Sequence, residues 1–391
     1  MRRFFKIAGW TIAGIVVVGL LFFFLVLPRF VDGVFNRTIN PGPYTVSAEA
    51  QALHDTLTVA DLHADSLLFG RDLLERSSMG HVDIPRLDEG NVALQVFSAV
   101  TQSPWGLNIE SNPADSDQIL LIAVGFRWPI RTWFSNLERA VYQAQRLADM
   151  AQRSDNKFVI VRSRKDLQIF LERRKQEPGI VAGVLAIEGA HALEGDPANV
   201  DRLFDAGYRM MSGAHFFDNP MAGSAHGEHK GGLTEAGIDM LKRMEGMGMI
   251  FDLSHASTQQ IDDALRLATK PVVVSHTGVR GTCDNNRNLT DDQLRRIAAT
   301  GGLVGIGFWD VAVCGTDAAA IAKAIVYTVG LIGADHVALG SDYDGTVQVP
   351  FDASGMAVLT EALMQAGMSN GDIAKVMGGN QIRLLGELLP Q

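Results

Sequence analysis

Cysteine is scarce in this chain, which has two among 391 residues. Two cysteines cannot build a disulfide scaffold or a four-cysteine zinc site. An excess of basic residues is also lacking, since the net charge is −10, and this argues against a nucleic-acid partner. Disorder is excluded because 47% of the residues are apolar and only 20% are charged. The composition therefore indicates a large folded domain.

Charged residues are absent from 7–27, which reads IAGWTIAGIVVVGLLFFFLVL. A helix over this run spans roughly 30 Å, the thickness of a bilayer core. Arg2, Arg3 and Lys6 precede it, and no small-residue cleavage site follows it. We expect a single-pass signal anchor in the lipid bilayer of the inner (cytoplasmic) membrane, with the domain on the periplasmic side. A cleaved signal peptide and a buried helix are the alternatives. The expected divisions are a basic stub at 1–6, the anchor at 7–27, a tether at 28–46 and one domain at 47–391.

Short apolar runs alternate with amphipathic stretches through the rest of the chain, as in buried parallel strands joined by helices. The runs are 57–62, 92–100, 180–187, 208–212, 249–253, 271–274, 303–308 and 337–339. Eight such units predict a closed (β/α)₈ TIM-like barrel, with a doubly wound open sheet as the second choice. Residues 101–157 form a long excursion that contains Trp105, Trp128 and Trp133. We expect an outer helix packed on the barrel there; a homodimer face and a membrane-resting patch are the alternatives.

Polar residues follow six of these runs. They are Asp61, His63 and Asp65, then Glu188, His215, Asp252 with His255, His276, and Asp342 with Asp344. In a barrel the carboxyl ends of all strands open onto one face, where catalytic residues gather. Imidazoles and carboxylates that converge there suit zinc, and buried charges are costly unless they are paired or bound to metal. The pattern therefore predicts a metal site.

The other histidines carry less weight. Solvated or capping roles are expected for His54, His81 and His336, and a supporting role beside Glu188 is open for His191. His226 and His229 lie in a glycine-rich loop, which predicts a cover over the site more than metal ligation.

The chain resembles the membrane dipeptidase (renal dipeptidase) family, peptidase family M19, within the metal-dependent hydrolase barrels, and looks most like its bacterial members. The matching pieces are Asp61-Leu62-His63-Ala64-Asp65, Ile187-Glu188-Gly189-Ala190-His191, Asp252-Leu253-Ser254-His255, Val274-Ser275-His276, Asn286-Arg287-Asn288, Gly340-Ser341-Asp342-Tyr343-Asp344 and Gly378-Gly379-Asn380. Leu62 and Ala64 depart from residues common in the family, but neither position is a ligand there. Ala214 stands where threonine is common, and this change bears on the hydrogen bonding of its loop.

The resemblance implies two Zn²⁺ ions and a dipeptide substrate. His63 and Asp65 would bind one ion, His255 and His276 the other, and Glu188 both. His215 would face the substrate carbonyl, Arg287 would hold the terminal carboxylate, and Asp342, rather than Asp344, would contact the water and the free amine. Two zinc ions that share a water lower its pKa and so supply hydroxide at neutral pH. Asp342 can then move the proton.

The sequence thus predicts a membrane-anchored zinc dipeptidase that hydrolyses the peptide bond of dipeptides with free termini. Another binuclear-zinc amidohydrolase, such as a lactonase or an acyl-amino-acid hydrolase, and a non-catalytic binding barrel are the alternatives. Cys283 and Cys314 follow neighbouring strands. A disulfide between them is a further expectation on the oxidising side of a membrane.

Overall fold

The chain folds into a closed barrel of eight parallel strands, as a computed structural model shows. The structure describes residues 2–391, and the side chains of 4–26 and 30–391. Neighbouring strands pair in the order β2, β1, β9, β8, β7, β6, β5, β4, and a further pairing of β2 with β4 closes the barrel. The strands are β1 (Val59–Ala64), β2 (Val92–Val100), β4 (Val181–Glu188), β5 (Tyr208–Ser212), β6 (Ile250–Asp252), β7 (Val273–Thr277), β8 (Leu303–Ile306) and β9 (Val337–Leu339). The predicted TIM-like barrel is confirmed.

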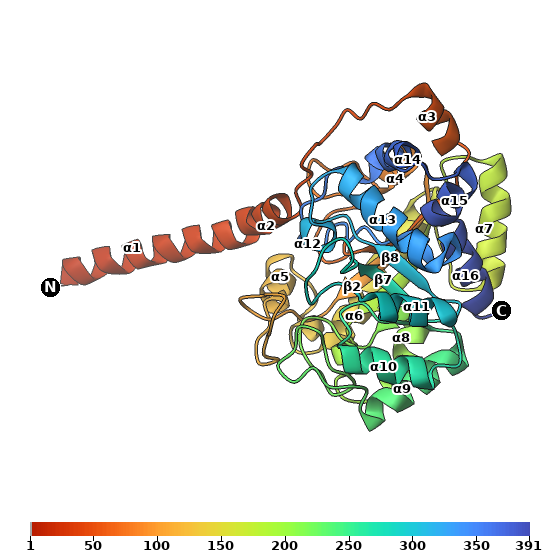
Figure 1. The fold of residues 1–391 in the computed structure, drawn as a ribbon. Helices are drawn as coiled ribbons and strands as arrows, with labels where there is room; N and C mark the ends of the chain where they lie inside the picture. The colour runs from red at the N-terminus through yellow and green to blue at the C-terminus, as the bar shows by residue number, and fades with distance from the viewer. Residues whose placement is uncertain (1) are drawn as a thin grey trace.

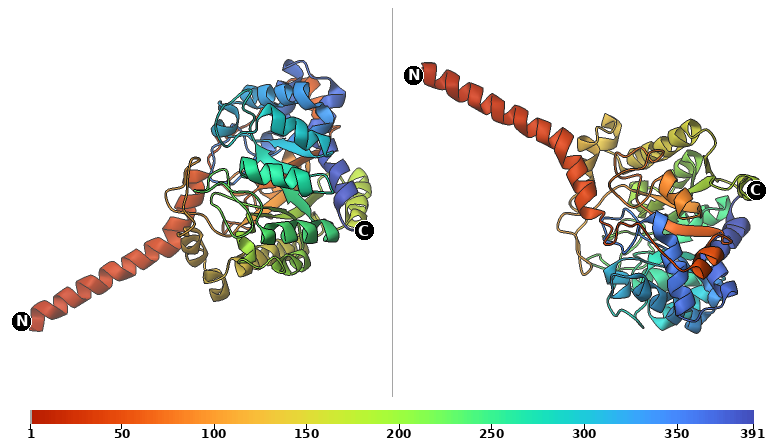
Figure 2. Two further views of the ribbon diagram at one scale, coloured as in Figure 1. Left: turned by 60° about the horizontal axis from the view of Figure 1, so that its bottom comes forward. Right: turned by 90° about the horizontal axis from the view of Figure 1, so that it is seen from above.

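Helices follow the strands and surround the barrel (Figures 1 and 2). They are α3 (Ala48–His54), α4 (Ile84–Glu89), α5 (Ile119–Gly125), α6 (Asn136–Arg153), α7 (Arg164–Gln176), α8 (Asn199–Ala206), α9 (Glu235–Met247), α10 (Thr258–Leu267), α11 (Asp291–Ala299), α12 (Asp310–Val313), α13 (Ala318–Ile332), α14 (Met356–Gln365), α15 (Asn370–Ala374) and α16 (Asn380–Leu388). The local sequence determines where several of these helices begin. Thr290 and Gln293 form a capping box at α11, and Ser369 caps α15.

Alternate residues of the strands enter two hydrophobic clusters. In β4, Val181, Leu185 and Ile187 pack with the surrounding helices, whereas Ala182 and Ala186 join a cluster that draws on all eight barrel strands. This is the two-residue period of a strand with helices outside and the barrel interior inside. Glu188 continues the inward series at the end of β4, so the local geometry directs its carboxylate into the barrel mouth.

A ninth short strand, β3 (Phe158–Ile160), pairs with the first residues of β4. The sequence does not predict this strand, because three residues give no usable periodicity. The preceding excursion forms α5, a 3₁₀ turn η2 (Ile130–Trp133) and α6. The central apolar stretch becomes α5, which buries Ile119 and Ala123 and exposes Leu121.

His54 is buried, so the expectation of a solvated or capping histidine is wrong there. Its ring nitrogens lie 2.8 Å from Thr360 Oγ1 and 3.0 Å from the Gly90 carbonyl oxygen. The ring therefore ties α3 to α14 and to the turn before β2. His336 is half-buried, with Nδ1 3.0 Å from the Gly302 carbonyl oxygen.

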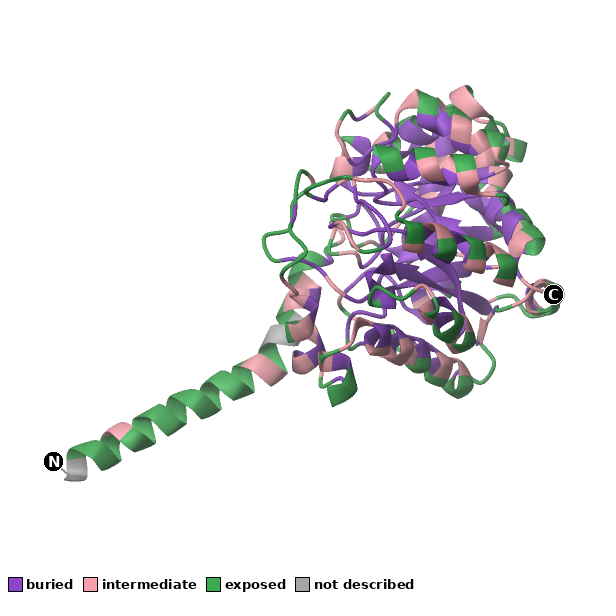
Figure 3. Cartoon of the chain, turned by 90° about the horizontal axis from the view of Figure 1, so that it is seen from below, coloured by how far each residue is buried: buried purple, intermediate pink, exposed green. Residues whose placement is uncertain are grey.

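The N-terminal segment is a helical rod that leaves the barrel (Figure 1). It comprises α1 (Arg2–Leu21), a π-helical turn η1 (Phe22–Val26) and α2 (Leu27–Phe35). Its span Phe4–Val26 is long and apolar enough to cross a membrane and has no buried residues in its most apolar window; Figure 3 shows its exposure. By contrast, the segment expected as a tether packs on the domain. Thr38 bridges to Val349, and the Ile39 amide donates to the Val349 carbonyl at 2.8 Å.

Candidate active site

Buried histidines from four other strand ends converge on Glu188. One oxygen, Oε1, lies 2.9 Å from His255 Nε2 and 3.2 Å from His276 Nε2. The other, Oε2, lies 3.3 Å from His215 Nε2. His63 Nε2 is 3.8 Å from Oε1. The predicted ligands from four separate strands are thus brought into one buried cluster.

A second group of side chains surrounds His63 on the same mouth. Its Nε2 lies 3.4 Å from Asp65 and 3.8 Å from Asp342 Oδ1. Three ligand sets have donor atoms within 4.8 Å of one another, and they share His63 and Glu188. The sets are His63 with Glu188 and His276, Glu188 with His215 and His255, and His63 with Asp65 and Asp342.

The electrostatics of the cluster favour the binding of additional positive charge. Burial raises the pKa of Asp65 and Glu188 well above the ordinary range and that of Asp342 to about 8, because carboxylates lie together away from water. Burial likewise lowers the pKa of His255 and His276, so both imidazoles are neutral donors. Asp65 Oδ1, with the Nδ1 atoms of His215 and His255, is buried without a hydrogen-bond partner among the described residues. Such a donor set fits a divalent cation.

A supporting carboxylate, Asp252, organises the histidines from behind. Its Oδ1 accepts from the amides of Ser254 and Ser275, each at 2.9 Å, and its Oδ2 accepts from the Ser275 hydroxyl at 2.6 Å. Ser275 Oγ lies 3.0 Å from His276 Nδ1 and 3.4 Å from His63 Nδ1. Partners of this kind fix ring orientation and tautomer in metal sites.

Asp61 plays the matching part at the first strand. It accepts hydrogen bonds from Gln95 Nε2 at 2.7 Å and from the amide and hydroxyl of Ser341 at 2.8 and 2.7 Å. The sequence places Asp61 and Asp252 at strand ends, but no role was predicted for either residue. Their place two and three residues before a ligand histidine was the available signal.

Two members of the cluster have left-handed backbone conformations, with φ of 62° at His255 and 59° at Asp342. Such conformations cost side-chain-bearing residues free energy and persist where the surroundings enforce them. Gly189, with φ of 94°, follows Glu188, and a Cβ there would come within 2.4 Å of the His191 ring. Only glycine allows this close approach.

Arg287 lies against the cluster, fully within the protein. Its Nη2 donates to the His276 carbonyl at 2.9 Å, and its guanidinium lies 5.5 Å from the Trp309 ring centre. Within residues 4–26 and 30–391 it makes no ion pair with a carboxylate. Cys283 and Cys314 form a disulfide close by, as expected. Asn285 Nδ2 also donates to the Val311 carbonyl at 2.8 Å, so the loop that carries Arg287 is tied to the loop after β8.

The glycine-rich loop at 222–229 covers the cluster. Ala225 donates its amide to the His255 carbonyl at 2.8 Å. His226 is buried, with its ring centre 5.2 Å from that of His255 and Nδ1 2.7 Å from the Ile109 carbonyl oxygen. His229 is exposed. His191 stacks on His215 with ring centres 6.4 Å apart, and neither of its ring nitrogens has a hydrogen-bond partner within the described chain.

Asp344 lies two residues after Asp342, but its side chain contacts Arg71 and His81 instead of the cluster around Glu188 and His63. Its Oδ2 lies 2.7 Å from Arg71 Nη2, and its amide donates to His81 Nδ1 at 2.9 Å. His81 is fully buried, and the neighbouring helix α4 is capped by Asp83, so the expectation of a solvated or capping role is wrong for His81. The pKa of Asp344 is raised by burial but is lowered overall, because Arg71 and His81 stabilise the charged form.

Residues 47–389 match the profile of the family described as "Membrane dipeptidase (Peptidase family M19)". The chain belongs to this family. As a member of the membrane dipeptidases it is a metallo-dipeptidase, and the family implies the use of metal. Dipeptidase tcpJ of Claviceps purpurea is 30% identical over 323 residues, which are 79% of this chain and 69% of that protein. Dipeptidase aclJ of Aspergillus oryzae is 35% identical over 221 residues, 54% of this chain and 52% of that protein.

Solved structures share the dipeptidase fold. A metallopeptidase described as dipeptidase AC is 25% identical, with a TM-score of 0.69 over 86% of this chain and 100% of its own. The probable dipeptidase PvdM of Pseudomonas aeruginosa, at 21% identity, has a TM-score of 0.72 over 87% of this chain and 98% of its own, which shows the fold alone.

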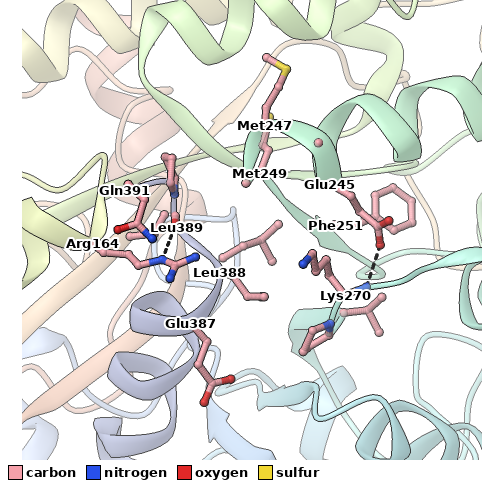
Figure 4. Close-up of a pocket in the computed structure, with 16 residues that line it drawn as sticks. Arg164, Glu245, Met247, Met249, Phe251, Lys270, Glu387, Leu388, Leu389 and Gln391 are labelled. Atoms are coloured by element: carbon pink, nitrogen blue, oxygen red, sulfur yellow. Dashed lines mark hydrogen bonds between the residues drawn. The ribbon is translucent and has the colours of Figure 1, made fainter.

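A separate cavity of 260 Å³ lies at the other end of the barrel (Figure 4). Residues at the beginnings of β6 and β7 line it together with the C-terminal residues. Arg164 donates there to the Leu389 carbonyl at 2.6 Å. Its lining contains none of the clustered His, Asp and Glu side chains.

Proposed function

We propose that this dipeptidase holds two zinc ions and cleaves dipeptides whose termini are both free. The observation that carries the proposal is the meeting of His255, His276 and His215 on the two oxygens of the buried Glu188. His63 and Asp65 would hold one ion, His255 and His276 the other, and Glu188 would contact both. Zinc, when bound, supplies a Lewis acid and lowers the pKa of a nearby water.

Asp342 is the proposed proton carrier. Its carboxylate lies on the mouth 3.8 Å from His63, and burial raises its pKa to about 8. A carboxyl group with such a pKa can take a proton from the attacking water and return it to the leaving amine near neutral pH. His215, whose Nε2 faces Glu188, would donate a hydrogen bond to the carbonyl oxygen as negative charge develops on it.

Arg287 is the proposed clamp for the C-terminal carboxylate. A guanidinium presents a planar fork that matches a carboxylate, and this one is buried without an acidic partner in the described part of the chain. Asp342 would hold the free ammonium at the other end. A clamp at each end of one peptide bond favours dipeptides over longer peptides and over blocked derivatives.

The test combines metal content with a substrate panel. Glu188→Ala should lose at least one zinc and nearly all dipeptide hydrolysis, because both groups of ligands meet on this carboxylate. The exposed Glu387→Ala is the matched control and should keep both. Elemental analysis that finds two tightly held zinc ions in Glu188→Ala, or equal kcat/KM of the wild type for a dipeptide and its C-terminal amide, would contradict the proposal.

We further propose that the span Phe4–Val26 anchors the enzyme in the inner membrane with the domain on the periplasmic side. Its apolar, unburied helix supports an anchor, and the disulfide suits an oxidising compartment. Protease added to intact spheroplasts should release the domain from the membrane. Protection until the cells are lysed would reverse the orientation.

A further inference from the structure

The barrel domain concentrates its exposed apolar side chains in one short segment. Beyond residue 40, every exposed large apolar side chain except Ile169 lies between residues 105 and 134. These side chains, here called the rim face, are Trp105, Leu107, Leu121, Ile130 and Phe134. Their exposed fractions run from 37% at Leu107 to 84% at Phe134. A gathering of this kind marks a surface that meets a protein or a membrane.

The rim face adjoins the end of the apolar helix. Val31 of α2 packs on a cluster that includes Ile119 and Trp128. Arg127, two residues past the end of α5, lies with its guanidinium 5.6 Å from the ring centre of Phe24. Phe24 belongs to the last turns of the span Phe4–Val26, so the end of α5 lies level with the end of that span. A cavity of 420 Å³ between the two is lined by Phe24, Leu25, Gly125, Phe126 and Arg127, among others.

The same end of the barrel carries the active site. The segment with the rim face follows β2, and its loop reaches over the mouth, where Asn286 donates to the Ile109 carbonyl at 2.6 Å. The loop after β9, two strands along the barrel from β2, also meets the juxtamembrane segment, where Asn36, just after α2, accepts from the Thr346 amide at 2.9 Å. Figures 1 and 2 show α5 and α2 together on the side from which the rod leaves, with α7 on the opposite side.

We propose that the rim face rests on the lipid bilayer, so that the active-site mouth opens toward the membrane surface. The inference rests on the proposed anchor. Continuity with that helix favours lipid as the occupant over a second copy of the chain, because a residue that touches Phe24 must lie at the interface when the span is inserted. Tryptophan and phenylalanine are suited to this depth, and the long stem of Arg127 can lie along apolar surface while its charge reaches the headgroups.

The test places one fluorescent label at a time on the full-length protein in lipid nanodiscs. Both native cysteines are in the disulfide, so an introduced cysteine is the reactive thiol. An environment-sensitive dye on Phe134→Cys, or on Leu121→Cys as a second position, reports the rim face. Ile169→Cys on α7, also exposed and apolar at 56%, is the matched control. Ile15→Cys, within the span, reports insertion.

When the discs contain spin-labelled lipid, we expect the fluorescence of labels at positions 134, 121 and 15 to be quenched. The label at position 169 should keep its fluorescence. Emission at 134 and 121 should also shift to shorter wavelength relative to protein in detergent. Quenching at 15 with none at 134 and 121 would overturn the inference and leave the anchor standing. Absence of quenching at 15 would overturn both. Spontaneous cross-linking of Phe134→Cys between two chains would identify a second copy as the occupant and would also overturn the inference.

Discussion

Arg71 lies between two buried aspartates, and its removal should destabilise the whole domain. Its Nε is 2.8 Å from Asp32 Oδ2, and its Nη2 is 2.7 Å from Asp344 Oδ2. Asp32 belongs to α2, next to the proposed anchor, and Asp344 to the loop that carries Asp342. The three buried side chains thus join the juxtamembrane helix to the loop that carries Asp342 through charge.

The magnitude follows from what each change leaves behind. Arg71→Met leaves the buried carboxylates of Asp32 and Asp344 without their guanidinium partner. Breaking a buried ion pair in this way costs about 3–5 kcal/mol. Asp32→Asn exchanges one charged hydrogen bond for a neutral one, a loss of about 1–1.5 kcal/mol. We expect this smaller loss of stability for Asp32→Asn because burial raises the pKa of Asp32, even though Arg71 opposes the shift. The charged form of Asp32 is therefore less strongly favoured. At about 2 °C of Tm per kcal/mol for a large domain, we expect losses of about 6–10 °C and about 2–3 °C.

Thermal unfolding of the full-length protein in detergent, followed by circular dichroism, measures these shifts. Arg153→Met is the matched control, because Arg153 pairs with Asp72 and Asp149 on the surface, where the charges are solvated; its Tm should not change. If Arg71→Met unfolds at the wild-type temperature, the network contributes nothing and the reasoning is refuted. If Arg71→Met and Arg153→Met lower Tm equally, burial is not the cause.

Three further predictions concern other parts of the enzyme. Arg287→Ala should abolish the preference for a dipeptide over its C-terminal amide while zinc content stays unchanged; a preserved preference in kcat/KM would place the carboxylate clamp elsewhere. Replacing Cys283 and Cys314 by serine should cost about 3–4 kcal/mol, as expected for a closed loop of 31 residues, and should raise KM because the loop of Arg287 is released; an unchanged Tm and KM would count against both effects. Burial lowers the pKa of His54, so the unfolded chain binds more protons below about pH 6.5, and stability should fall as the pH drops through that value. Thermal unfolding at pH 7 and 5.5 should show a smaller loss of Tm for His54→Gln than for the wild type. Equal losses of Tm would contradict this prediction.

The sequence was informative wherever a short-range pattern decides the structure. Continuous apolar runs located all eight barrel strands, because a strand covered on both faces leaves no polar position. The residues that end the runs, such as His63, Glu188 and His276, then had to meet, since parallel strands deliver their carboxyl ends to one mouth. The roles of these residues remain predictions, but their proximity follows from topology alone.

Other features depend on contacts between distant parts of the chain. His54 reads as a surface residue of a short helix, and only the approach of Thr360 makes it a buried link. The segment around Asp32 reads as a tether because its partner Arg71 lies in an irregular loop without periodicity. Asp252 acts through Ser275, which belongs to the next strand. No local pattern encodes pairings of this kind.

The loop after β9 shows how one short segment serves two environments. Asp342 and Asp344 are two residues apart and both are buried, yet burial leaves the first with a raised pKa, whereas Arg71 and His81 lower that of the second. Left-handed backbone at both residues, with φ of 59° and 62°, lets the loop turn sharply enough to send the two carboxylates different ways. Such backbone costs about 1–3 kcal/mol per residue. Contacts that the juxtamembrane segment makes, from Asp32 to Arg71 and from Asn36 to Thr346, offset part of that cost. The segment beside the proposed anchor is therefore part of the structure that holds the proposed proton carrier in place.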